Sequence, residues 1–308
     1  MARVPSLPAV RRRLGRVALK AAHRLDPSSA PQAARPWVAP GHFYSPIPSW
    51  AELQPRADTL FGTAPAQLPD VDLNPRQQLD CLAEFEPLRN DRLYAPGDAR
   101  TVRYHSDNRM FGAKSANALH FMLRRLAPKR IVEVGSGFSS AVMLDTDQHF
   151  FGNSLELTFI EPYPERLFGR MSAEDRRRCE VIQSPLQAAP RAAFEALQAG
   201  DVVFVDSSHV LKTGSDLCTL FFEILPALRA GVYVHFHDIL YPFEYPQTWV
   251  EQGRAWNEAY ALRALLADSR AYALEFWASY LFRCHRQALQ QVPEVDADGS
   301  SIWIRKLT

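Results

Sequence analysis

The sequence predicts an α/β fold, with a mainly parallel sheet covered by helices on both faces and a proline-rich N-terminal extension. Three observations predict it. From about residue 115, short apolar runs bounded by turn or cap signals alternate with stretches of helical periodicity. Glycines and acidic residues follow several of these runs, as they do at the ligand-binding edge of such sheets. Fourteen of the 23 prolines lie in the first 100 residues, which disfavours long regular elements there.

The expected elements follow in order along the chain. A helix at residues 115–126 comes first, because apolar residues recur there at a helical spacing. We expect strands at residues 130–134, 155–161, 180–182, 202–206 and 232–237. Helices are expected between and after them, including 139–147, 185–197, 214–228 and 256–268. Two late strands lack a clear helical crossover and could form an antiparallel addition to the sheet, at 272–282 and 301–306.

The first 100 residues divide into two segments that precede a domain at residues 101–308. Residues 1–26 form a basic arm with seven Lys or Arg and one Asp, a net charge of +6, so the rest of the chain carries −5. Residues 27–100 are expected to form an extended wrap punctuated by prolines. Within this wrap, Asn74 and Pro75 suit the N-cap and the first position of a short helix at 75–85.

The composition favours a cytoplasmic protein. No run approaches the roughly 18 apolar residues that a membrane-spanning helix needs, and the N-terminus lacks the apolar core of a secretory signal. The four cysteines are widely spaced, as expected for thiols in a reducing compartment. The basic arm could form an amphipathic helix and make a peripheral membrane or protein contact. Nucleic acid is not an expected partner, because the rest of the chain is acidic.

The first ligand-binding signal follows the first strand of the domain. Glu133 precedes a turn at residues 135–137, whose two glycines allow a ligand to approach the backbone closely. Glu161 ends the second strand, where it could accept hydrogen bonds from a ribose diol. A nicotinamide fingerprint would need a third glycine where this chain has Ser140, which weakens that interpretation.

A second signal follows the fourth and fifth strands. Asp206 and His209 come after the fourth strand, and Asp238 comes after the fifth. Carboxylates at adjacent strand ends could hold a divalent cation, and a histidine three residues past Asp206 could act as a general base. His235 is more consistent with a packed core histidine, and the aromatic loop at 240–249 could either stack on a ligand or plug the core.

These motifs resemble the class I S-adenosylmethionine-dependent methyltransferases and, within them, the group catalogued as methyltransferase domain 24. The resemblance rests on residues 131–140, 159–163, 201–209 and 225–238, together with 42–48 near the start. It implies a Rossmann-like, seven-stranded, mostly parallel sheet whose last strand is antiparallel. It also implies S-adenosyl-L-methionine as the cofactor, with the methionine part near the first turn, the ribose at Glu161 and the adenine beside 184–187. The implied cofactor-binding residues are Glu133, Gly135, Ser136, Gly137, Ser139, Glu161, Ser184 and Asp206.

A further resemblance, to metal-assisted O-methyltransferases of the catechol type, concerns the ends of the fourth and fifth strands. It implies Mg²⁺ or another divalent cation held by Asp206, His237 and Asp238, although an oxygen ligand is usual at the position of His237. It also implies His209 as the catalytic base that takes the proton of the acceptor hydroxyl, with Asp206 beside it.

The expected function is therefore methylation of a hydroxyl on a small molecule or a glycan. Two alternatives stay open. A nicotinamide-dependent oxidoreductase could use the same glycine turn, and a non-catalytic scaffold could keep the fold while the N-terminal segments hold a partner. The sequence also leaves the assembly state open, a homo-oligomer included.

Overall fold

The computed structural model describes residues 36–91, 93–94 and 102–308. Contacts within the chain separate two units, Met1–Pro55 and Arg56–Thr308. The basic arm at 1–26, together with its expected amphipathic helix, lies outside the described residues. The division into arm, wrap and methyltransferase domain therefore stays a prediction.

The described part of the first unit is short and rich in aromatic side chains. Its only helices within residues 36–55 are α2 (Trp50–Leu53) and the start of η3 (Gln54–Arg56). The rings of Trp37 and Tyr44 stack with centroids 5.2 Å apart, and Phe43 lies 4.1 Å from Tyr44. All three side chains are largely exposed.

The second unit is built on one mixed sheet of seven strands in its described residues. The strands are β1 (Arg130–Val134), β2 (Glu156–Ile160), β3 (Glu180–Ile182), β4 (Val202–Val205), β5 (Tyr233–Phe236), β6 (Tyr272–Trp277) and β7 (Ile302–Lys306). Their order is β3-β2-β1-β4-β5-β7-β6, and the pairs from β3 to β5 are parallel. Strand β7 runs antiparallel to both β5 and β6. The expected Rossmann-like sheet with an antiparallel last strand is confirmed.

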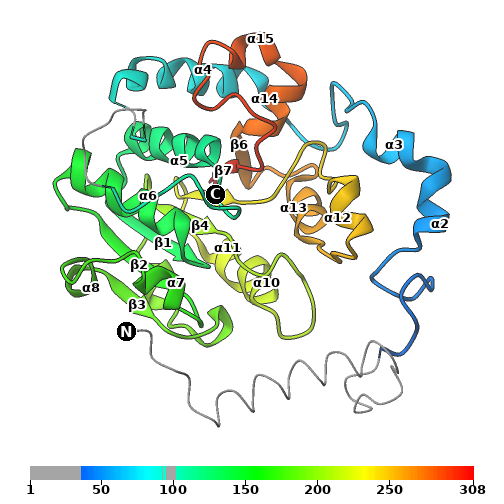
Figure 1. Ribbon diagram of the computed structural model, residues 1–308, viewed down its shortest axis with the longest axis horizontal. Coiled ribbons are helices and arrows are strands. Elements are labelled where there is room, and N and C mark those ends of the chain that lie inside the picture. Colours follow the sequence, from blue (N-terminus) through cyan, green and yellow to red (C-terminus); the bar gives the residue numbers. More distant parts are fainter. Residues whose placement is uncertain (1–35, 92, 95–101) are drawn as a thin grey trace, which may run out of the picture. The chain divides into compact units, whose positions relative to one another are not determined.

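Helices flank both faces of this sheet. Figure 1 shows α4 and α5 on one side of it and α10 and α11 on the other. Those before β4 are α3 (Ala57–Phe61), α4 (Pro75–Phe85), η4 (Pro87–Asp91), α5 (Ala113–Leu126), α6 (Phe138–Thr146), η5 (Asp147–Phe151), α7 (Glu165–Phe168), α8 (Asp175–Arg178), η6 (Leu186–Ala188) and α9 (Ala192–Glu195). Those after β4 are α10 (Asp216–Thr219), η7 (Leu220–Ile224), α11 (Leu225–Ala227), α12 (Gln247–Glu251), α13 (Glu258–Leu266), α14 (Ala278–Cys284) and α15 (Arg286–Leu289).

Two expected elements are wrong in extent. The strand expected at 272–282 ends at Trp277, and the apolar run continues as α14. The helix expected at 185–197 is instead two short pieces, η6 and α9, separated by Pro190. Proline lacks an amide hydrogen and clashes with the preceding turn, so it prevents one continuous helix there.

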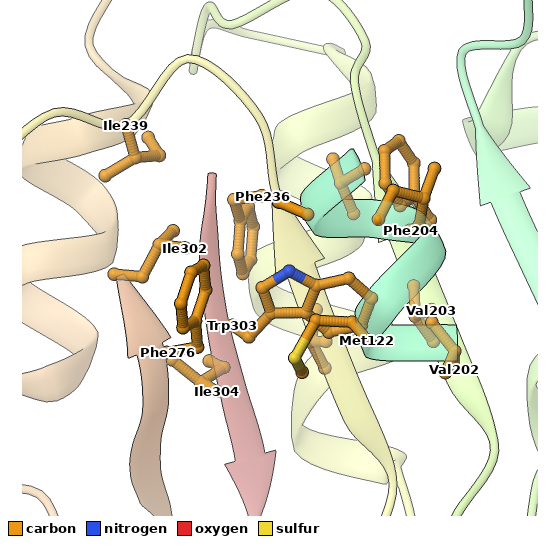
Figure 2. Close-up of a cluster of buried hydrophobic side chains, with 14 of the residues drawn as sticks. Met122, Val202, Val203, Phe204, Phe236, Ile239, Phe276, Ile302, Trp303 and Ile304 are labelled. Carbon is orange, nitrogen blue, oxygen red and sulfur yellow. The ribbon is translucent and has the colours of Figure 1, made fainter. Parts of the chain in front are cut away.

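The core of the sheet is filled by large apolar side chains. Figure 2 shows part of it, with Met122 of α5 together with Phe204, Phe236 and Trp303 from β4, β5 and β7. All four side chains are fully buried. Burying one such side chain stabilises a fold by roughly 1.5–3 kcal/mol. The strands that end at the site therefore pack against a dense core that restricts their movement.

The later part of the expected wrap packs against β6 and α13. Helix α4 packs beside β6, and the backbone N–H of Trp277 donates to Gln78 of α4 at 2.8 Å. Asn74 precedes α4 as expected, but its side chain does not cap the helix. Its Nδ2 donates instead to the carbonyl oxygen of Leu274 at 3.1 Å. Asp70 accepts two hydrogen bonds from Arg263 of α13, each of 2.9 Å.

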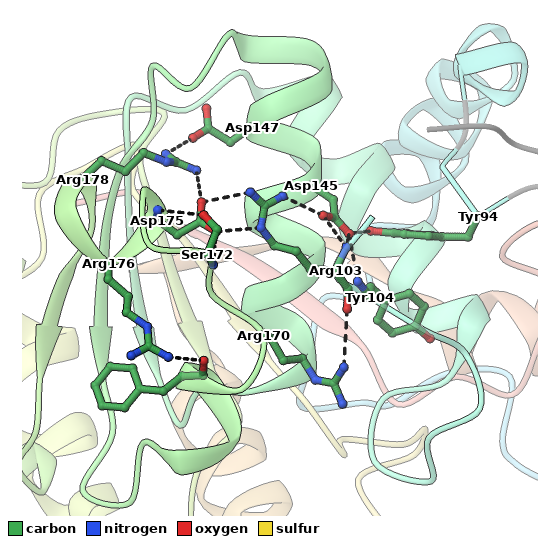
Figure 3. Close-up of polar contacts among 11 residues, drawn as sticks. Tyr94, Arg103, Tyr104, Asp145, Asp147, Arg170, Ser172, Asp175, Arg176 and Arg178 are labelled. Atoms are coloured by element: carbon green, nitrogen blue, oxygen red, sulfur yellow. Dashed lines mark hydrogen bonds and ion pairs between the residues drawn. The ribbon is translucent and has the colours of Figure 1, made fainter. Parts of the chain in front are cut away.

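A buried ionic network holds the segment that precedes α5. The Arg103 guanidinium donates to both oxygens of Asp175, at 2.8 and 3.0 Å, and to Asp145 at 3.0 Å (Figure 3). Asp145 also accepts the backbone N–H groups of Arg103 and Tyr104. Arg178 reaches Asp175 as well, at 3.5 Å. These bonds join the segment around Arg103 to α6 and α8.

No helix within the described residues combines the length and the apolar character needed to cross a membrane.

We expect Arg103→Met to lower the free energy of unfolding by about 3 kcal/mol or more, because it leaves the buried carboxylates of Asp145 and Asp175 short of a counter-charge. Urea denaturation measures this change. Arg283→Met is the matched control, because the pair of Arg283 with Asp298 is about one third exposed on each side and is expected to contribute less than about 1 kcal/mol. Equal losses in the two variants would contradict a structural role for the network.

Candidate active site

A cavity of about 800 Å³ opens at the carboxyl ends of β1, β2, β4 and β5. Ligands of open α/β sheets bind at this edge, and ligand sites in proteins measure roughly 300–1,000 Å³. The cavity is therefore large enough for more than one small ligand. The residues that line it after the four strands include Gly135, Ser136, Gly137, Ser139, Glu161, Asp206, Ser207, Ser208, His209 and Asp238.

The turn after β1 passes directly over the end of β4. Gly135 has a φ of +83°, and a Cβ on it would overlap the carbonyl oxygen of Asp206. A residue with a side chain is therefore excluded at this position. The Ser140 hydroxyl accepts the N–H of Gly137 at 2.8 Å, so the residue that departs from the nicotinamide fingerprint closes the turn.

Glu133 lies beneath this turn and is fully buried. Its carboxylate accepts hydrogen bonds from the hydroxyls of Ser139, at 2.5 Å, and Ser140. Burial raises the pKa of Glu133 to about 8, although the two hydroxyls act in the opposite direction. Glu133 is therefore largely protonated at neutral pH.

Glu161 stands at the tip of β2, on the same side of the cavity as the glycine turn. Its two oxygens accept the backbone N–H groups of Ser136, at 3.0 Å, and Tyr163, at 2.8 Å. These bonds fix the carboxylate while it remains half-exposed to the cavity. A carboxylate held in this way can accept further hydrogen bonds from a diol.

An acid–histidine cluster lies where β4 and β5 end. Nε2 of His209 is 3.5 Å from an oxygen of Asp206 and 3.8 Å from an oxygen of Asp238. One ligand atom from each of the three lies within 4.8 Å of the others. His209 and Asp238 both have a φ of +59°, a left-handed conformation that is unfavourable for residues with side chains. Such strain is typical of functional sites.

A third carboxylate completes the cluster from behind. Nδ1 of His209 is 2.8 Å from Oε2 of Glu258, the first residue of α13, and both side chains are buried. Burial opposes the charge on His209, but hydrogen bonds with Asp206 and Glu258 outweigh it and raise the pKa of His209 to about 10. Without a further cation in the cluster, His209 is therefore an imidazolium at neutral pH.

The wall beside this cluster is aromatic. The ring of Trp256 lies 4.3 Å from the ring of His209, and Trp249 lies 5.2 Å from Trp256, all measured between centroids. Arg254 lies against both indoles, with its guanidinium carbon 4.5 Å from the ring of Trp249 and 4.9 Å from the ring of Trp256. All three residues line the cavity.

Comparison with known proteins identifies the family. Residues 132–239 match a family described as a methyltransferase domain. An uncharacterized protein of Archaeoglobus fulgidus is 32% identical over 163 residues, which cover 52% of this chain and 73% of that protein. The chain belongs to the class I S-adenosylmethionine-dependent methyltransferases.

Two solved structures match this methyltransferase at low sequence identity and low TM-score. The S-adenosylhomocysteine-bound methyltransferase PaMTH1 of Podospora anserina is 15% identical, with a TM-score of 0.41, over 84% of this chain and 95% of that chain. A CmcI structure with magnesium and S-adenosylmethionine is 16% identical, with a TM-score of 0.40, over 72% of this chain and 84% of that chain.

Most of the predicted cofactor residues line the cavity of the methyltransferase. Gly135, Ser136, Gly137, Ser139, Glu161 and Asp206 do so, and the side chain of Ser136 has a buried Oγ without a partner among the described residues. Glu133 and Ser184 are not among the lining residues, but Pro185, Leu186 and Gln187 beside Ser184 are. Glu133 acts on the turn through Ser139 and Ser140, and its direct contact with the cofactor stays a prediction.

The predicted metal set is regrouped by the structure. Asp206 and Asp238 converge with His209, whereas the predicted third ligand, His237, lies outside this group. His237 is buried with its Nε2 3.7 Å from Asp238, on the side of Ser300, and its ring lies 4.9 Å from Phe111. His235 stacks on Phe204 at 3.9 Å and bonds Ser301, as a core histidine does.

The aromatic loop after β5 is divided between the two expected roles. Tyr241, Phe243 and Tyr245 are buried, and the Tyr241 hydroxyl donates to the carbonyl oxygen of Pro65 at 2.7 Å. These three side chains therefore plug the core. Trp249, at the end of the loop, lines the cavity instead.

Sequence reasoning missed Glu258, Trp256 and Arg254. Glu258 follows His209 by 49 residues and was expected only as part of the helix at 256–268. No local pattern in the sequence relates it to His209. Arg254 and Trp256 lie in an irregular connection that carries no motif.

We expect the stability of the protein to fall as pH rises from about 4.5 to about 8, because folded Glu133 keeps a proton that the unfolded chain releases. The expected contribution is about 1.4 kcal/mol per pH unit within this window. Glu133→Gln should remove that slope, as measured by urea denaturation at several pH values. Glu156→Gln, at the exposed start of β2, should keep the wild-type slope, and an unchanged slope in the Glu133 variant would contradict the buried neutral acid.

Proposed function

We propose that this methyltransferase transfers the methyl group of S-adenosyl-L-methionine to a hydroxyl of a small molecule or a glycan. The observation that carries the proposal is the convergence of Asp206, His209 and Asp238 on the cavity that the glycine turn also enters. One end of the cavity therefore suits the cofactor, and the other suits an oxygen that must lose a proton.

The residues of the cofactor end fit the shape and polarity of an adenosylated amino acid. The turn at 135–137 lets a ligand approach the backbone, and the unpartnered Oγ of Ser136 offers it a hydrogen bond. The carboxylate of Glu161 is held by two backbone N–H groups and can accept both ribose hydroxyls. The bound cofactor would supply the electrophilic methyl group.

At the acceptor end, Glu258 fixes the orientation of His209. A hydrogen bond from Nδ1 to Glu258 leaves Nε2 directed at Asp206 and Asp238, where the acceptor hydroxyl would lie. With a cation at Asp206 and Asp238 to release the proton that these carboxylates otherwise hold on His209, the neutral imidazole would take the hydroxyl proton on Nε2, and Glu258 would stabilise the imidazolium that results. The flanking carboxylates favour that charged form.

The same cluster fits a divalent cation, and His209 replaces His237 in the set that would hold it. Two carboxylate oxygens and one imidazole nitrogen suit Mn²⁺ or a similar transition metal better than Mg²⁺, which prefers oxygen ligands. Bound by Asp206 and Asp238, such an ion would polarise the acceptor oxygen and offset the carboxylate charge that now holds a proton on His209. Nε2 offers one lone pair, so His209 is either a ligand or the base at any moment.

Isothermal titration with S-adenosylhomocysteine tests the cofactor end. Wild-type protein should bind it, and Glu161→Ala should weaken binding by roughly 10- to 100-fold, since a charge-assisted hydrogen bond contributes about 1.5–3 kcal/mol. Glu156→Ala, at the opposite end of β2, should bind like the wild type. No detectable heat at millimolar ligand in the wild type would rule out the proposed function.

His209→Ala is expected to lower kcat by roughly 10²- to 10⁴-fold and to leave the affinity for S-adenosylhomocysteine unchanged. Mass spectrometry of methyl gain on candidate hydroxylated acceptors measures the turnover. Titration of the wild type and of His209→Ala with Mn²⁺ separates the two roles of His209. The variant should bind Mn²⁺ more weakly if His209 is a metal ligand, and equally well if His209 is only the base. Equal losses of turnover and cofactor binding would show that His209 is structural.

A further inference from the structure

We propose that the acceptor carries an anionic group, a carboxylate or a phosphate, and that Arg254 binds this group at the mouth of the cavity. The inference rests on the proposed function, because it names the class of molecule that would occupy the acceptor end. It assigns a binding role to a loop between α12 and α13 that has none in the chemistry described so far.

The side chain of Arg254 is held by aromatic contacts, and its positive charge is not paired with a carboxylate of the described residues. Its guanidinium carbon lies within 5 Å of the ring centres of Trp249 (4.5 Å) and Trp256 (4.9 Å), whose planes meet at 75°. Its Nε donates to Gln252 at 3.0 Å. No carboxylate among the described residues pairs with it, and its two terminal nitrogens have no partner there. A guanidinium with both terminal nitrogens free presents the planar fork that binds carboxylates and phosphates in two parallel hydrogen bonds.

Other unpaired cations line the same cavity. Lys212, just after the acid–histidine cluster, and Arg109, before α5, both face it, and within the described residues neither forms an ion pair. Arginines elsewhere on the second unit are commonly paired, as in the pairs of Arg263 with Asp70, Arg283 with Asp298 and Arg305 with Glu275. The cavity therefore holds positive charge that no carboxylate of the described residues pairs with.

The order of charges along the cavity wall fixes how an acceptor would lie. The indole of Trp256 contacts both groups, with the ring of His209 at 4.3 Å and the guanidinium carbon of Arg254 at 4.9 Å from its centroid. The carboxylates around His209 repel an anion, so the acid group of the acceptor must lie away from the reacting hydroxyl. An acceptor with a hydroxyl at one end, an apolar ring that packs along the aromatic wall and an acid at the other end satisfies both conditions.

The positive charge at Arg254 is not needed for the cofactor. Arg166, which lies against Gly137 in the glycine turn, is the cation closest to the cofactor end, and it lowers the pKa of Asp206 only as a minor contributor. Arg254 instead belongs with Trp249 and Trp256 to the aromatic wall beside the acid–histidine cluster. Removal of its charge should therefore change acceptor binding and leave S-adenosylhomocysteine binding intact.

The test uses the full chain loaded with S-adenosylhomocysteine and three probes, which are caffeate, caffeyl alcohol and inorganic phosphate. Caffeate and caffeyl alcohol differ only in the acid group at the end remote from the ring hydroxyls. Binding is measured by titration calorimetry and by the change in tryptophan emission, to which Trp249 and Trp256 contribute among the six tryptophans of the chain. Wild-type protein should bind caffeate at least about 10-fold more tightly than the alcohol, and phosphate should compete with caffeate. Acetate is added as a further competitor, because it is a carboxylate without the ring of caffeate. Whether acetate or phosphate competes more strongly with caffeate distinguishes a carboxylate acceptor from a phosphorylated one.

Three variants assign the effect to Arg254. Arg254→Gln should reduce the preference for caffeate to less than about 2-fold, and Arg254→Lys should keep part of it because the charge remains without the fork. Arg270→Gln is the matched control, since Arg270 is exposed and precedes β6 at the opposite edge of the sheet. The preference should be unchanged in it.

The inference is overturned if the wild type binds neither caffeate nor phosphate, if it binds caffeate and the alcohol equally, or if Arg254→Gln keeps the preference. Binding of S-adenosylhomocysteine is recorded in the same experiments. Its loss in the wild type would refute the proposed function, whereas intact cofactor binding without an anion preference would refute only the acceptor class.

Discussion

The close approach of the β1 turn to the end of β4 is the constraint on which the site depends. Parallel pairing places the N–H of Asp206 2.9 Å from the carbonyl oxygen of Val134, and the chain then leaves β1 directly over Asp206. Only a residue without a Cβ fits at Gly135, whose φ is +83°. The glycine turn and the acid–histidine cluster therefore open into one cavity, so that a donor and an acceptor bound at these two places share one space.

The positions of the strands along the chain were predicted well from the sequence, because a buried parallel strand is a short apolar run that ends abruptly at polar residues. Val134, Val205 and Phe236 each end such a run, and the polar residues after them identified the binding edge. The prediction failed where an apolar run serves two elements. The run at 272–282 is equally apolar in β6 and in α14, and a short apolar run does not distinguish a strand from a buried helix.

The candidate site was predictable only where a residue follows a strand directly. Asp206, Asp238 and Glu161 needed no more than that position. His209 lies in the cluster because its own backbone is left-handed, with a φ of +59°. Glu258 contacts His209 because α13 begins beside this turn. Neither a positive φ at a histidine nor the docking of a helix 49 residues later leaves a local pattern in the sequence.

The charged side chains of the cavity form two groups, an excess of carboxylates around His209 and a set of cations that includes Arg254. Three carboxylates surround one imidazole at the strand ends, and Oε1 of Glu258 is buried there without a partner in the described part of the chain. The lining cations Arg109, Lys212 and Arg254 lie on loops and pair with none of these acids within the described residues. Arg254 contacts two indoles in place of a carboxylate. Each such contact is favourable by about 0.5–2 kcal/mol, and the electrostatic compensation is left to the ligands. A ligand set that brings positive charge to the carboxylates and negative charge to Arg254 would bind such a cavity most tightly, and a sulfonium cofactor with an acidic acceptor has that distribution.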